Sequence, residues 1–435
     1  MTTISLQGFK RYFANTSWMM SEKIVSMVVA LFVGIYVIRY LGPERFGLLS
    51  YAMSFVALFS AIATLGLERI VIRNLVQANE DKDKLLCTAF ILKAIGGLLL
   101  IILVFIGVQF TSSDKFTKML VLIIAGGMLF QSFNVIDFYF QSRVLAKFTS
   151  FAQICSIFVS SVTKLMLIAI HAPLVWFAWA FVLENVVLAI ALILVYHKQK
   201  LEFLRWRFEK SLAMELLRDS WPLILSGLAI MVYMRIDQIM IKEMLDSKAV
   251  GNYAAAVRLS EAWYFIPMAI SSSLFPAIIN ARKVSEEFYY DRLQKLYDLM
   301  VWMGIAIVIP TTLLADPIVK ILFGNQYLPA AGVLRIHIWA GVFVFLGVAS
   351  SQYLIAENYT RISFSRTFIG AIANVILNII LIPKYGINGA AFATLISYFV
   401  ATFFIGFIAK TNRQVVLMLK SFLLPIRCLR KEYVR

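Results

Sequence analysis

Charged residues are scarce in this sequence: they make up 15% of its 435 residues, whereas a typical soluble protein has about 25%. Cysteine and histidine are scarcer still, with three of each. These counts exclude a disulfide scaffold and argue against a Cys/His metal site. Hydrophobic residues make up 61% of the chain, more than the cores of one or two soluble domains can bury. The composition therefore predicts an all-α polytopic membrane protein.

Twelve segments of the chain are apolar enough to cross a bilayer, which takes about 20 mostly apolar residues. They are 15–39, 47–68, 85–108, 118–140, 150–170, 174–196, 221–241, 253–279, 296–319, 332–355, 364–383 and 387–409. Several of these segments contain Asn, Gln, Ser, Pro or charged residues. Such residues are typical of helices that face the interior of a bundle or a wet cavity.

Basic residues outnumber acidic ones by 41 to 24, which gives a formal net charge of +17. In a membrane protein this excess indicates topology rather than nucleic-acid binding. If the N-terminus is cytoplasmic, the cytoplasmic segments hold about three times as many Lys and Arg residues as the opposite side. Both termini are therefore expected in the cytoplasm.

The connections between the predicted spans are short, and the longest polar one is 197–220. This segment and the tail mix Leu and Phe with Lys and Arg, a pattern typical of amphipathic helices on an anionic leaflet. A solvated linker with a topogenic charge cluster is the other interpretation. No loop is long enough to hold a soluble catalytic domain.

A weak repeat joins the two halves of the chain. Residues 40–52 recur as 244–256, with a Leu, a Gly and an Ala that match at one offset. Each copy lies between the first and second spans of a six-span half. Because six is even, both halves have the same orientation, related by a parallel pseudo-twofold axis, which is a transporter architecture. The predicted domains are an N-terminal lobe at 1–196, a linker at 197–220, a C-terminal lobe at 221–410 and a basic tail at 411–435.

Apart from the basic residues assigned to the two sides of the membrane, we interpret five cations as embedded in the spans, where a charge costs about 3 kcal/mol at the bilayer centre. They are Lys23, Lys93, Lys164, Arg235 and Arg335. Lys164 continues a polar stripe along one face of its span. Snorkelling to the nearer interface is the alternative interpretation, and for Lys23 and Arg335 the two interpretations weigh equally. For the other three cations we favour a cavity that holds an anionic cargo.

Intramembrane carboxylates commonly relay protons or bind cations in transporters. Asp137, Asp237 and Glu261 are therefore candidates for coupling to proton or sodium movement. A structural ion pair with one of the embedded cations is the alternative for each of them. Asn374 and Asn378 are four residues apart on one helix face, which favours hydrogen bonds between helices over a role as ligands.

Motifs of soluble enzymes are absent. The sequence has no P-loop, no G-x-S-x-G and no H-E-x-x-H, and its histidines show no metal-ligand spacing. We therefore expect no catalytic residue, no metal site and no cofactor, and interpret the chain as a transporter.

Four stretches of the sequence resemble Wzx-type O-antigen flippases, in the polysaccharide transporter branch of the MATE/MOP superfamily. They are 39–47, 235–241, 250–276 and 374–391. This resemblance implies twelve helices in two six-helix lobes and alternating access in the bacterial inner membrane. It also implies as substrate an undecaprenyl-diphosphate-linked oligosaccharide repeat unit, moved from the cytoplasmic to the periplasmic leaflet. The implied partners are membrane lipids, a polysaccharide polymerase and a chain-length regulator, and not nucleic acid.

Within that family, the embedded cations would hold the diphosphate in a central cavity while the polyprenyl tail stays in lipid. Three other functions compete with this one. A multidrug or metabolite cation antiporter of the same fold would need an acidic or aromatic cavity. A membrane polysaccharide polymerase or ligase would need a long outer loop. A scaffold for other polysaccharide enzymes would not need embedded charges.

Overall fold

The computed structural model describes residues 6–77, 82–201, 206–357 and 359–429, which are almost entirely helical and contain no strand. The chain separates into two compact units, Met1–Ile236 and Asp237–Arg435, and we describe each by itself. Their boundary lies inside α8 (Lys210–Met244), beyond the predicted linker at 197–220. The first part of α8 belongs to the first unit because Leu223 lies so close to Gly66 that no side chain would fit between them.

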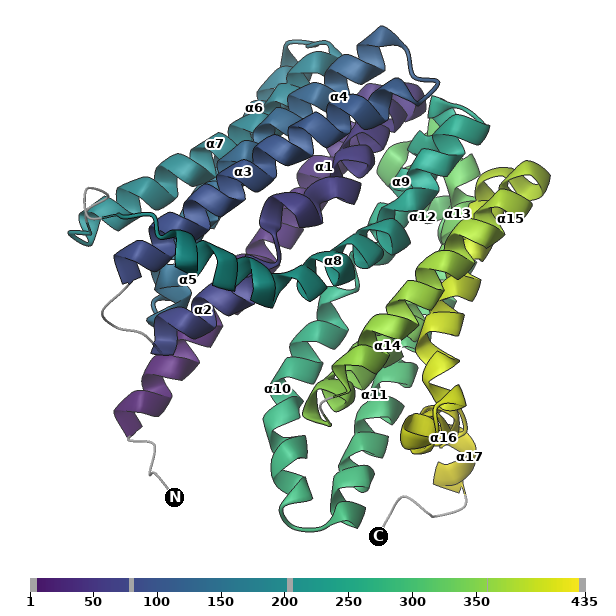
Figure 1. The fold of residues 1–435 in the computed structure, drawn as a ribbon. Helices are drawn as coiled ribbons and strands as arrows, with labels where there is room; N and C mark the ends of the chain where they lie inside the picture. Colours follow the sequence, from purple (N-terminus) through teal and green to yellow (C-terminus); the bar gives the residue numbers. More distant parts are fainter. Residues whose placement is uncertain (1–5, 78–81, 202–205, 358, 430–435) are drawn as a thin grey trace. The chain divides into compact units, whose positions relative to one another are not determined.

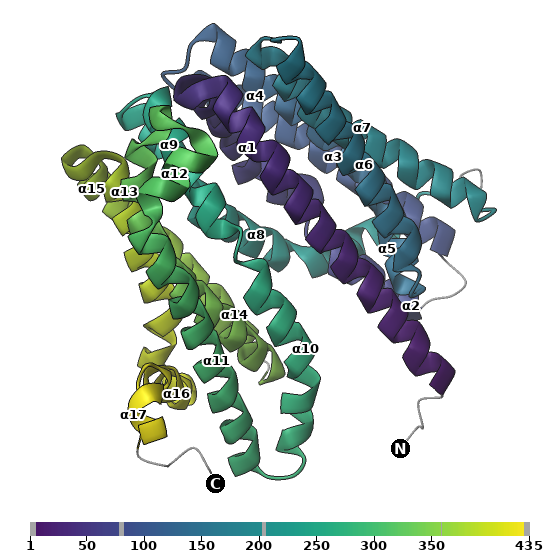
Figure 2. The same cartoon turned by 180° about the vertical axis from the view of Figure 1, so that it is seen from behind.

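The first unit is built around one long N-terminal helix. Its elements are α1 (Leu6–Thr64), α2 (Leu67–Gln77), α3 (Lys82–Gln109), α4 (Lys115–Gly127), the 3-10 turn η1 (Met128–Asn134), α5 (Val135–Ser142), α6 (Ala146–Ala169), α7 (Leu174–Lys198) and the first part of α8. Helix α1 packs against α3 and α6, and α4 packs against α7. Figure 1 and Figure 2 show α1 in purple, running beside α6.

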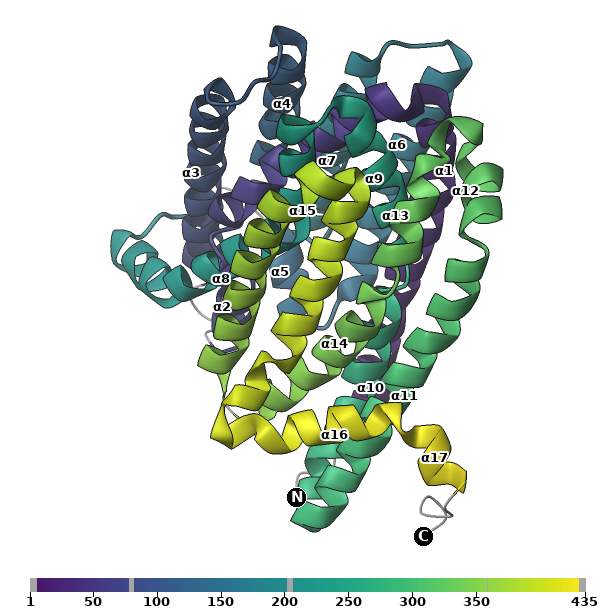
Figure 3. The same cartoon turned by 90° about the vertical axis from the view of Figure 1, so that its right-hand side faces the viewer.

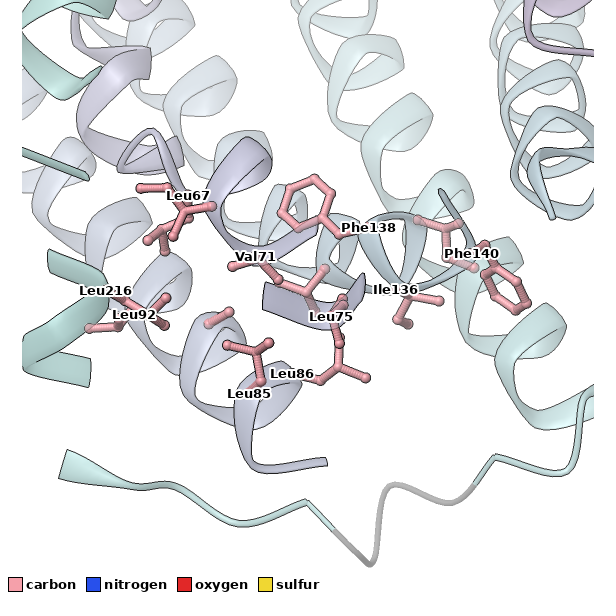
Figure 4. Packing of buried hydrophobic residues seen from close by; sticks show 14 of the residues in the cluster. Leu67, Val71, Leu75, Leu85, Leu86, Leu92, Ile136, Phe138, Phe140 and Leu216 are labelled. Carbon is pink, nitrogen blue, oxygen red and sulfur yellow. The ribbon is translucent and has the colours of Figure 1, made fainter. Parts of the chain in front are cut away.

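Short helices of the first unit pack around an apolar core (Figure 4). The buried residues of α2 recur every three to four positions, which places them on one face of the helix. That face meets Leu86 and Leu92 of α3 and Ile136 and Phe138 of α5. Lys93 follows Leu92 in α3, and Asp137 follows Ile136 in α5. The packing therefore brings Lys93 and Asp137 near enough to interact electrostatically.

The second unit has a core of its own, centred on α11 and α14. Its elements are the end of α8, then α9 (Ser247–Glu261), α10 (Phe265–Arg282), α11 (Glu286–Leu313), α12 (Ala315–Phe323), the 3-10 turn η3 (Asn325–Tyr327), α13 (Pro329–His337), α14 (Ala340–Ala356), α15 (Thr360–Phe403), the 3-10 turns η4 (Phe404–Phe407) and η5 (Ala409–Thr411), α16 (Asn412–Phe422) and α17 (Leu424–Leu429). Tyr297 and Met300 of α11 pack with Phe345 and Ala349 of α14 in this core. Helix α16 packs on α11 and runs across the end of the long helices (Figure 3).

The chain is a multi-pass membrane protein. Ten helices of the described residues are long and apolar enough to cross a membrane, and eight of them each correspond to one predicted span. The other two, Asn15–Gln77 and Arg361–Phe407, each contain two predicted spans. Each of these is interrupted by a non-helical glycine, Gly42 or Gly386. The all-helical membrane fold is therefore confirmed, and the count of twelve spans stays a prediction. The predicted span 296–319 is too long, because α11 ends at Leu313 and α12 begins a separate helix at Ala315.

The two segments predicted to be amphipathic are only partly described. In the segment 197–220, α7 ends at Lys198 and α8 begins at Lys210, and residues 202–205 lie outside the described residues. In the tail, α16 exposes the apolar side chains of Val416 and Leu419 beside exposed Lys420. Residues 430–435 of the tail also lie outside the described residues.

A substitution at Gly386 tests how much the break in α15 depends on glycine. The φ of 59° and ψ of −139° at Gly386 are essentially accessible to glycine alone. No atom lies within 4 Å of the position that a Cβ would take there, so only the backbone resists a side chain. We expect Gly386→Ala to lower the free energy of unfolding by about 1–3 kcal/mol, measured by thermal unfolding in detergent.

Gly126 of α4 supplies the matched control, because a Cβ there also meets no atom within 4 Å but the backbone is helical. Gly126→Ala should leave the melting temperature unchanged or raise it slightly, since alanine favours helix by about 0.5–1 kcal/mol over glycine. Equal melting temperatures for the two variants would contradict the proposed strain at Gly386.

Candidate functional site

Lys93 is the most deeply buried of the predicted cations, with 3% of its surface exposed. Its ammonium lies 4.8 Å from the centre of the Phe138 ring, an arrangement in which the ring face attracts the cation. The carboxyls of Glu68 and Asp137 are near enough to act on it electrostatically. Asp137 also accepts a hydrogen bond of 2.9 Å from Gln141. Lys93 and Asp137, predicted for different roles, therefore belong to one cluster in the first unit.

Small residues follow Lys93 on α3, and neighbouring helices occupy the space beside them. A Cβ on Gly96 would lie 2.6 Å from the carbonyl oxygen of Ile62 in α1. A Cβ on Gly97 would lie 3.3 Å from the side chain of Leu129 in η1. The glycines thus permit close helix packing, and this packing keeps Lys93 buried.

Lys164 forms an ion pair, with its ammonium 3.0 Å from a carboxylate oxygen of Glu184 in α7. Ser160 donates a hydrogen bond of 2.6 Å to the same carboxylate oxygen. Ser156 donates one of 2.7 Å to the Glu184 backbone carbonyl. The polar stripe of α6 is therefore turned toward Glu184. Lys164 thus forms a structural ion pair between α6 and α7, and its substrate-binding role stays a prediction.

The remaining predicted cations lie in different surroundings. Lys23 is exposed on α1, and Arg235 is half-buried on α8. Arg335 of α13 pairs with Asp316 of α12, in the second unit. The described contacts thus do not gather the five cations into one cluster.

Asp237 is the centre of a buried polar network in the second unit, and only 3% of it is exposed. The hydroxyls of Tyr253 in α9 and Thr394 in α15 each donate to one carboxylate oxygen, both at 2.6 Å. The amide of Asn378 donates to the other oxygen at 2.5 Å, and to Asn374 Oδ1 at 3.1 Å. The hydrogen bond between helices that the asparagine spacing predicts is therefore confirmed for Asn378.

The path of α15 explains how the network forms. Asn374 and Asn378 lie before the non-helical Gly386, and Thr394 lies after it. The break lets the two parts of α15 approach Asp237 together. Asp246 then caps α9 by accepting a hydrogen bond of 2.7 Å from the amide of Ala249, which begins the helix that carries Tyr253.

The network is rich in oxygen and holds one formal negative charge. Besides the Asp237 carboxylate, it contains the side-chain oxygens of Asn374, Asn378 and Thr394. The carbonyl of Ala390 also accepts a hydrogen bond of 3.0 Å from Thr394. Among the described residues, no group donates a hydrogen bond to the buried Asn378 Oδ1. One carboxylate with neutral oxygens is a donor set that suits a proton or a small monovalent cation.

The surroundings of the Asp237 network contain no zinc-type cluster among the described residues, and the other predicted acid of this unit lies elsewhere on α9. Among the described residues, no three His, Cys, Asp or Glu side chains gather as they would around a zinc-type metal ion. Glu261, the other predicted acid of this unit, lies half-buried at the end of α9. Beside it, Ser260 forms a hydrogen bond of 2.9 Å with Nδ1 of buried His337.

Several buried polar residues lie outside the set predicted from embedded charges. Tyr253 and Thr394 carry no charge, so a search for embedded charges could not find them. Arg366 is also buried, and donates to the backbone carbonyl of Gly347 at 3.1 Å and to Ser350 at 3.3 Å. Its place near the start of a predicted span is the signal that could have added it to the embedded cations.

A family model described as "Polysaccharide biosynthesis protein" matches residues 12–282, well over half of the chain. A second model, MatE, matches residues 222–380. A similar curated protein is the "Probable low-salt glycan biosynthesis flippase Agl15" of Haloferax volcanii, 28% identical over 174 residues. That match covers 39% of this chain and 36% of the relative, so this chain spans less than two thirds of that relative's length.

Solved structures show the fold. The lipid II flippase MurJ, in an inward closed conformation, has a TM-score of 0.75 and 16% identity, over 96% of this chain and 93% of that one. An inward-facing multidrug resistance MATE transporter of the MOP superfamily also has a TM-score of 0.75, with 17% identity, over 90% of this chain and 95% of that one. The predicted MOP fold is confirmed.

Thr394 allows a test of the Asp237 network that preserves side-chain shape. Thr394→Val removes the hydroxyl that donates to buried Asp237. We expect a loss of about 1.5–3 kcal/mol in the free energy of unfolding, because the lost hydrogen bond is to a charged group. Thermal unfolding in detergent measures this loss.

Thr367→Val is the matched control on the same helix, because the Thr367 hydroxyl bonds only to the carbonyl of Ser363, one turn before it. This variant should change the free energy of unfolding by less than about 0.5 kcal/mol. Equal losses in the two valine variants would show that the Asp237 network adds nothing to stability.

Proposed function

This chain belongs to the polysaccharide biosynthesis protein family, and we propose that it is a flippase for a lipid-linked oligosaccharide. The observation that carries this proposal is the family match over residues 12–282 in a multi-pass MOP fold. The names of two similar proteins support it, since Agl15 is called a glycan biosynthesis flippase and MurJ a lipid II flippase. The proposed substrate is an undecaprenyl-diphosphate-linked repeat unit of a surface polysaccharide such as O-antigen.

The chemistry of the substrate explains why buried cations matter. A diphosphate cannot cross about 30 Å of hydrocarbon unaided, because each charge loses its water. Lys93 is buried in the first unit with an aromatic ring and carboxylates around it, and is our first choice for the diphosphate contact. Lys23, Lys164, Arg235 and Arg335 remain proposed contacts along the path. In this proposal Lys164 exchanges Glu184 for the substrate during transport.

The topology proposed for the chain places both termini in the cytoplasm, since basic residues concentrate on that side. The substrate is then loaded from the cytoplasmic leaflet and released to the outer leaflet of the cytoplasmic (inner) membrane. A polymerase and a chain-length regulator would act on the released unit.

Ion coupling is proposed at Asp237. The oxygens of Asp237, Asn374, Asn378, Thr394 and Ala390 would hold a sodium ion, which supplies the positive charge that the buried carboxylate lacks. The unsatisfied Asn378 Oδ1 supports this proposal, because a buried amide oxygen that accepts no hydrogen bond can coordinate a cation. Asp137, which faces Lys93, and Glu261 are the less favoured coupling residues.

A cation antiporter of the MATE type is the second candidate. The MatE match over residues 222–380 and the equal TM-score to a MATE transporter favour it. It would use Asp237 in the same way, but would carry an organic cation instead of a diphosphate. A polymerase or ligase is disfavoured, since these matches are to transport folds.

Replacement of Lys93 tests the proposed substrate. Lys93→Met keeps the length of the side chain and removes its charge, so we expect export of surface polysaccharide to fall about tenfold or more, as loss of about 1.4 kcal/mol or more of diphosphate binding would produce. The measurement is complementation of a strain that lacks its own flippase, with the membrane level of each variant determined in parallel.

Lys295→Gln is the control, since Lys295 is exposed and pairs only with Asp291 on its own helix. It should complement like the wild type. Full complementation by Lys93→Met would refute the contact of Lys93 with the diphosphate. Failure of the wild type itself to complement would favour the antiporter.

Sodium binding at Asp237 is tested by stability. Sodium should raise the melting temperature of the wild type over potassium at equal ionic strength. The corresponding gain in the free energy of unfolding is about 2.7 kcal/mol when the sodium concentration is about 100 times its dissociation constant. Asp237→Asn should abolish this gain, whereas Glu261→Gln should retain it. A sodium effect that survives in Asp237→Asn would place the ion elsewhere.

A further inference from the structure

An apolar groove runs between α4 and α7 of the first unit, helices that pack side by side (Figure 1). Its volume is about 620 Å³, within the range of about 300–1,000 Å³ that small-molecule sites occupy. Its walls are almost wholly apolar and consist of Met119, Leu122, Ile123, Phe130, Trp179 and Val182. Neither the predicted cations nor the Asp237 network belongs to it.

Two adjacent glycines shape the groove in opposite ways. Gly126 lines it, and a Cβ on this residue would meet no atom within 4 Å. Gly127 faces α7, where a Cβ would lie 3.3 Å from the side chain of Val182. Gly127 therefore brings the two helices together, while Gly126 leaves the space beside that contact open.

The length of the groove corresponds to one leaflet of a bilayer. From Lys115 to Gly126, α4 rises about 16 Å at 1.5 Å per residue, which is about half of a hydrocarbon core of 30 Å. Lys115 is the first residue of α4, so the lysine end of the groove is the end of a membrane-crossing helix and lies near the headgroups.

Positive charge is concentrated at the same end. Lys115 and Lys118 line the groove and lie three residues apart on α4, so they share one face. The neighbouring carboxylate, Asp114, is already engaged: it caps α4 by accepting from the amide of Thr117 at 3.2 Å and also from its hydroxyl. These bonds hold the pKa of Asp114 below its ordinary value. Lys118 donates to the side-chain oxygen of Gln109 at 3.2 Å, a neutral partner.

We propose that this groove binds the polyprenyl chain of the lipid carrier, with its diphosphate on Lys115 and Lys118. This inference rests on the proposed flippase function and adds a second contact with the substrate, outside the Lys93 cluster. A single groove suits one isoprenoid chain better than the two acyl chains of a phospholipid. Two lysines on one face suit two phosphates. In the proposed topology this end faces the outer leaflet, so the groove holds the carrier after its headgroup has crossed.

Lipid retention by the full-length protein tests the groove. The protein is purified from nanodiscs that contain undecaprenyl diphosphate and phosphatidylglycerol, and the retained lipids are identified by native mass spectrometry. The wild type should retain undecaprenyl diphosphate in preference to phosphatidylglycerol. Gly126→Leu, which fills the groove, and the double variant Lys115→Gln/Lys118→Gln should each retain at least fivefold less of it.

Lys320→Gln is the matched control, since it removes an exposed lysine of α12 in the other unit. It should retain lipid like the wild type. A photo-crosslinking amino acid at Met119 should capture the polyprenyl chain, and the same group at exposed Leu99 of α3 should not. If Gly126→Leu does not fold, the lysine variant and the crosslink still decide the question.

The outcomes separate the groove from the proposed function. If the wild type retains undecaprenyl diphosphate but the groove variants retain as much, the groove is refuted while the flippase proposal stands. If the wild type retains phosphatidylglycerol as well as undecaprenyl diphosphate, and the groove variants lose both, the groove binds an ordinary lipid and the polyprenyl proposal is refuted. If the wild type retains no undecaprenyl diphosphate at all, both proposals fail.

Discussion

A polar group inside a bilayer has no water to bond with, so it must find its partners within the protein. Much of the arrangement of both units follows from this constraint. Asp237 receives hydrogen bonds from α9 and from both parts of α15. Asp298 of α11 accepts from Gln294 at 2.8 Å and pairs at 3.2 Å with Arg427, which ties the C-terminal helices to the second unit.

The same constraint distinguishes the buried charges from one another. Lys164 and Glu184 neutralise each other. Ser160 donates to the Glu184 carboxylate, and Ser156 donates to its backbone carbonyl, so these bonds stabilise the contact of α6 with α7. The ammonium of Lys93 instead faces an aromatic ring, with the carboxyls of Glu68 and Asp137 near enough to act on it electrostatically. A cation held in this way keeps more of its positive field for an anion that approaches it.

A flippase and a drug antiporter can share this fold, so the backbone alone does not decide the cargo. The side chains of each unit suggest a division of tasks. The first unit carries the buried Lys93 and the groove that ends in Lys115 and Lys118, features suited to a lipid diphosphate. The second unit carries the oxygen-rich surroundings of Asp237, suited to a small cation. Transport coupled to an ion needs both.

The sequence alone predicts the membrane class, most of the long apolar helices one by one, and several of the charges within them. These properties follow from composition and from the helical period, which are local. It also placed Asn374 and Asn378 on one helix face. The pairing of Lys164 with Glu184, and of Asp237 with Thr394, 157 positions further along the chain, is visible in the folded protein alone. Such pairings depend on which helices pack together and on the turn at Gly386, which helical periodicity does not contain.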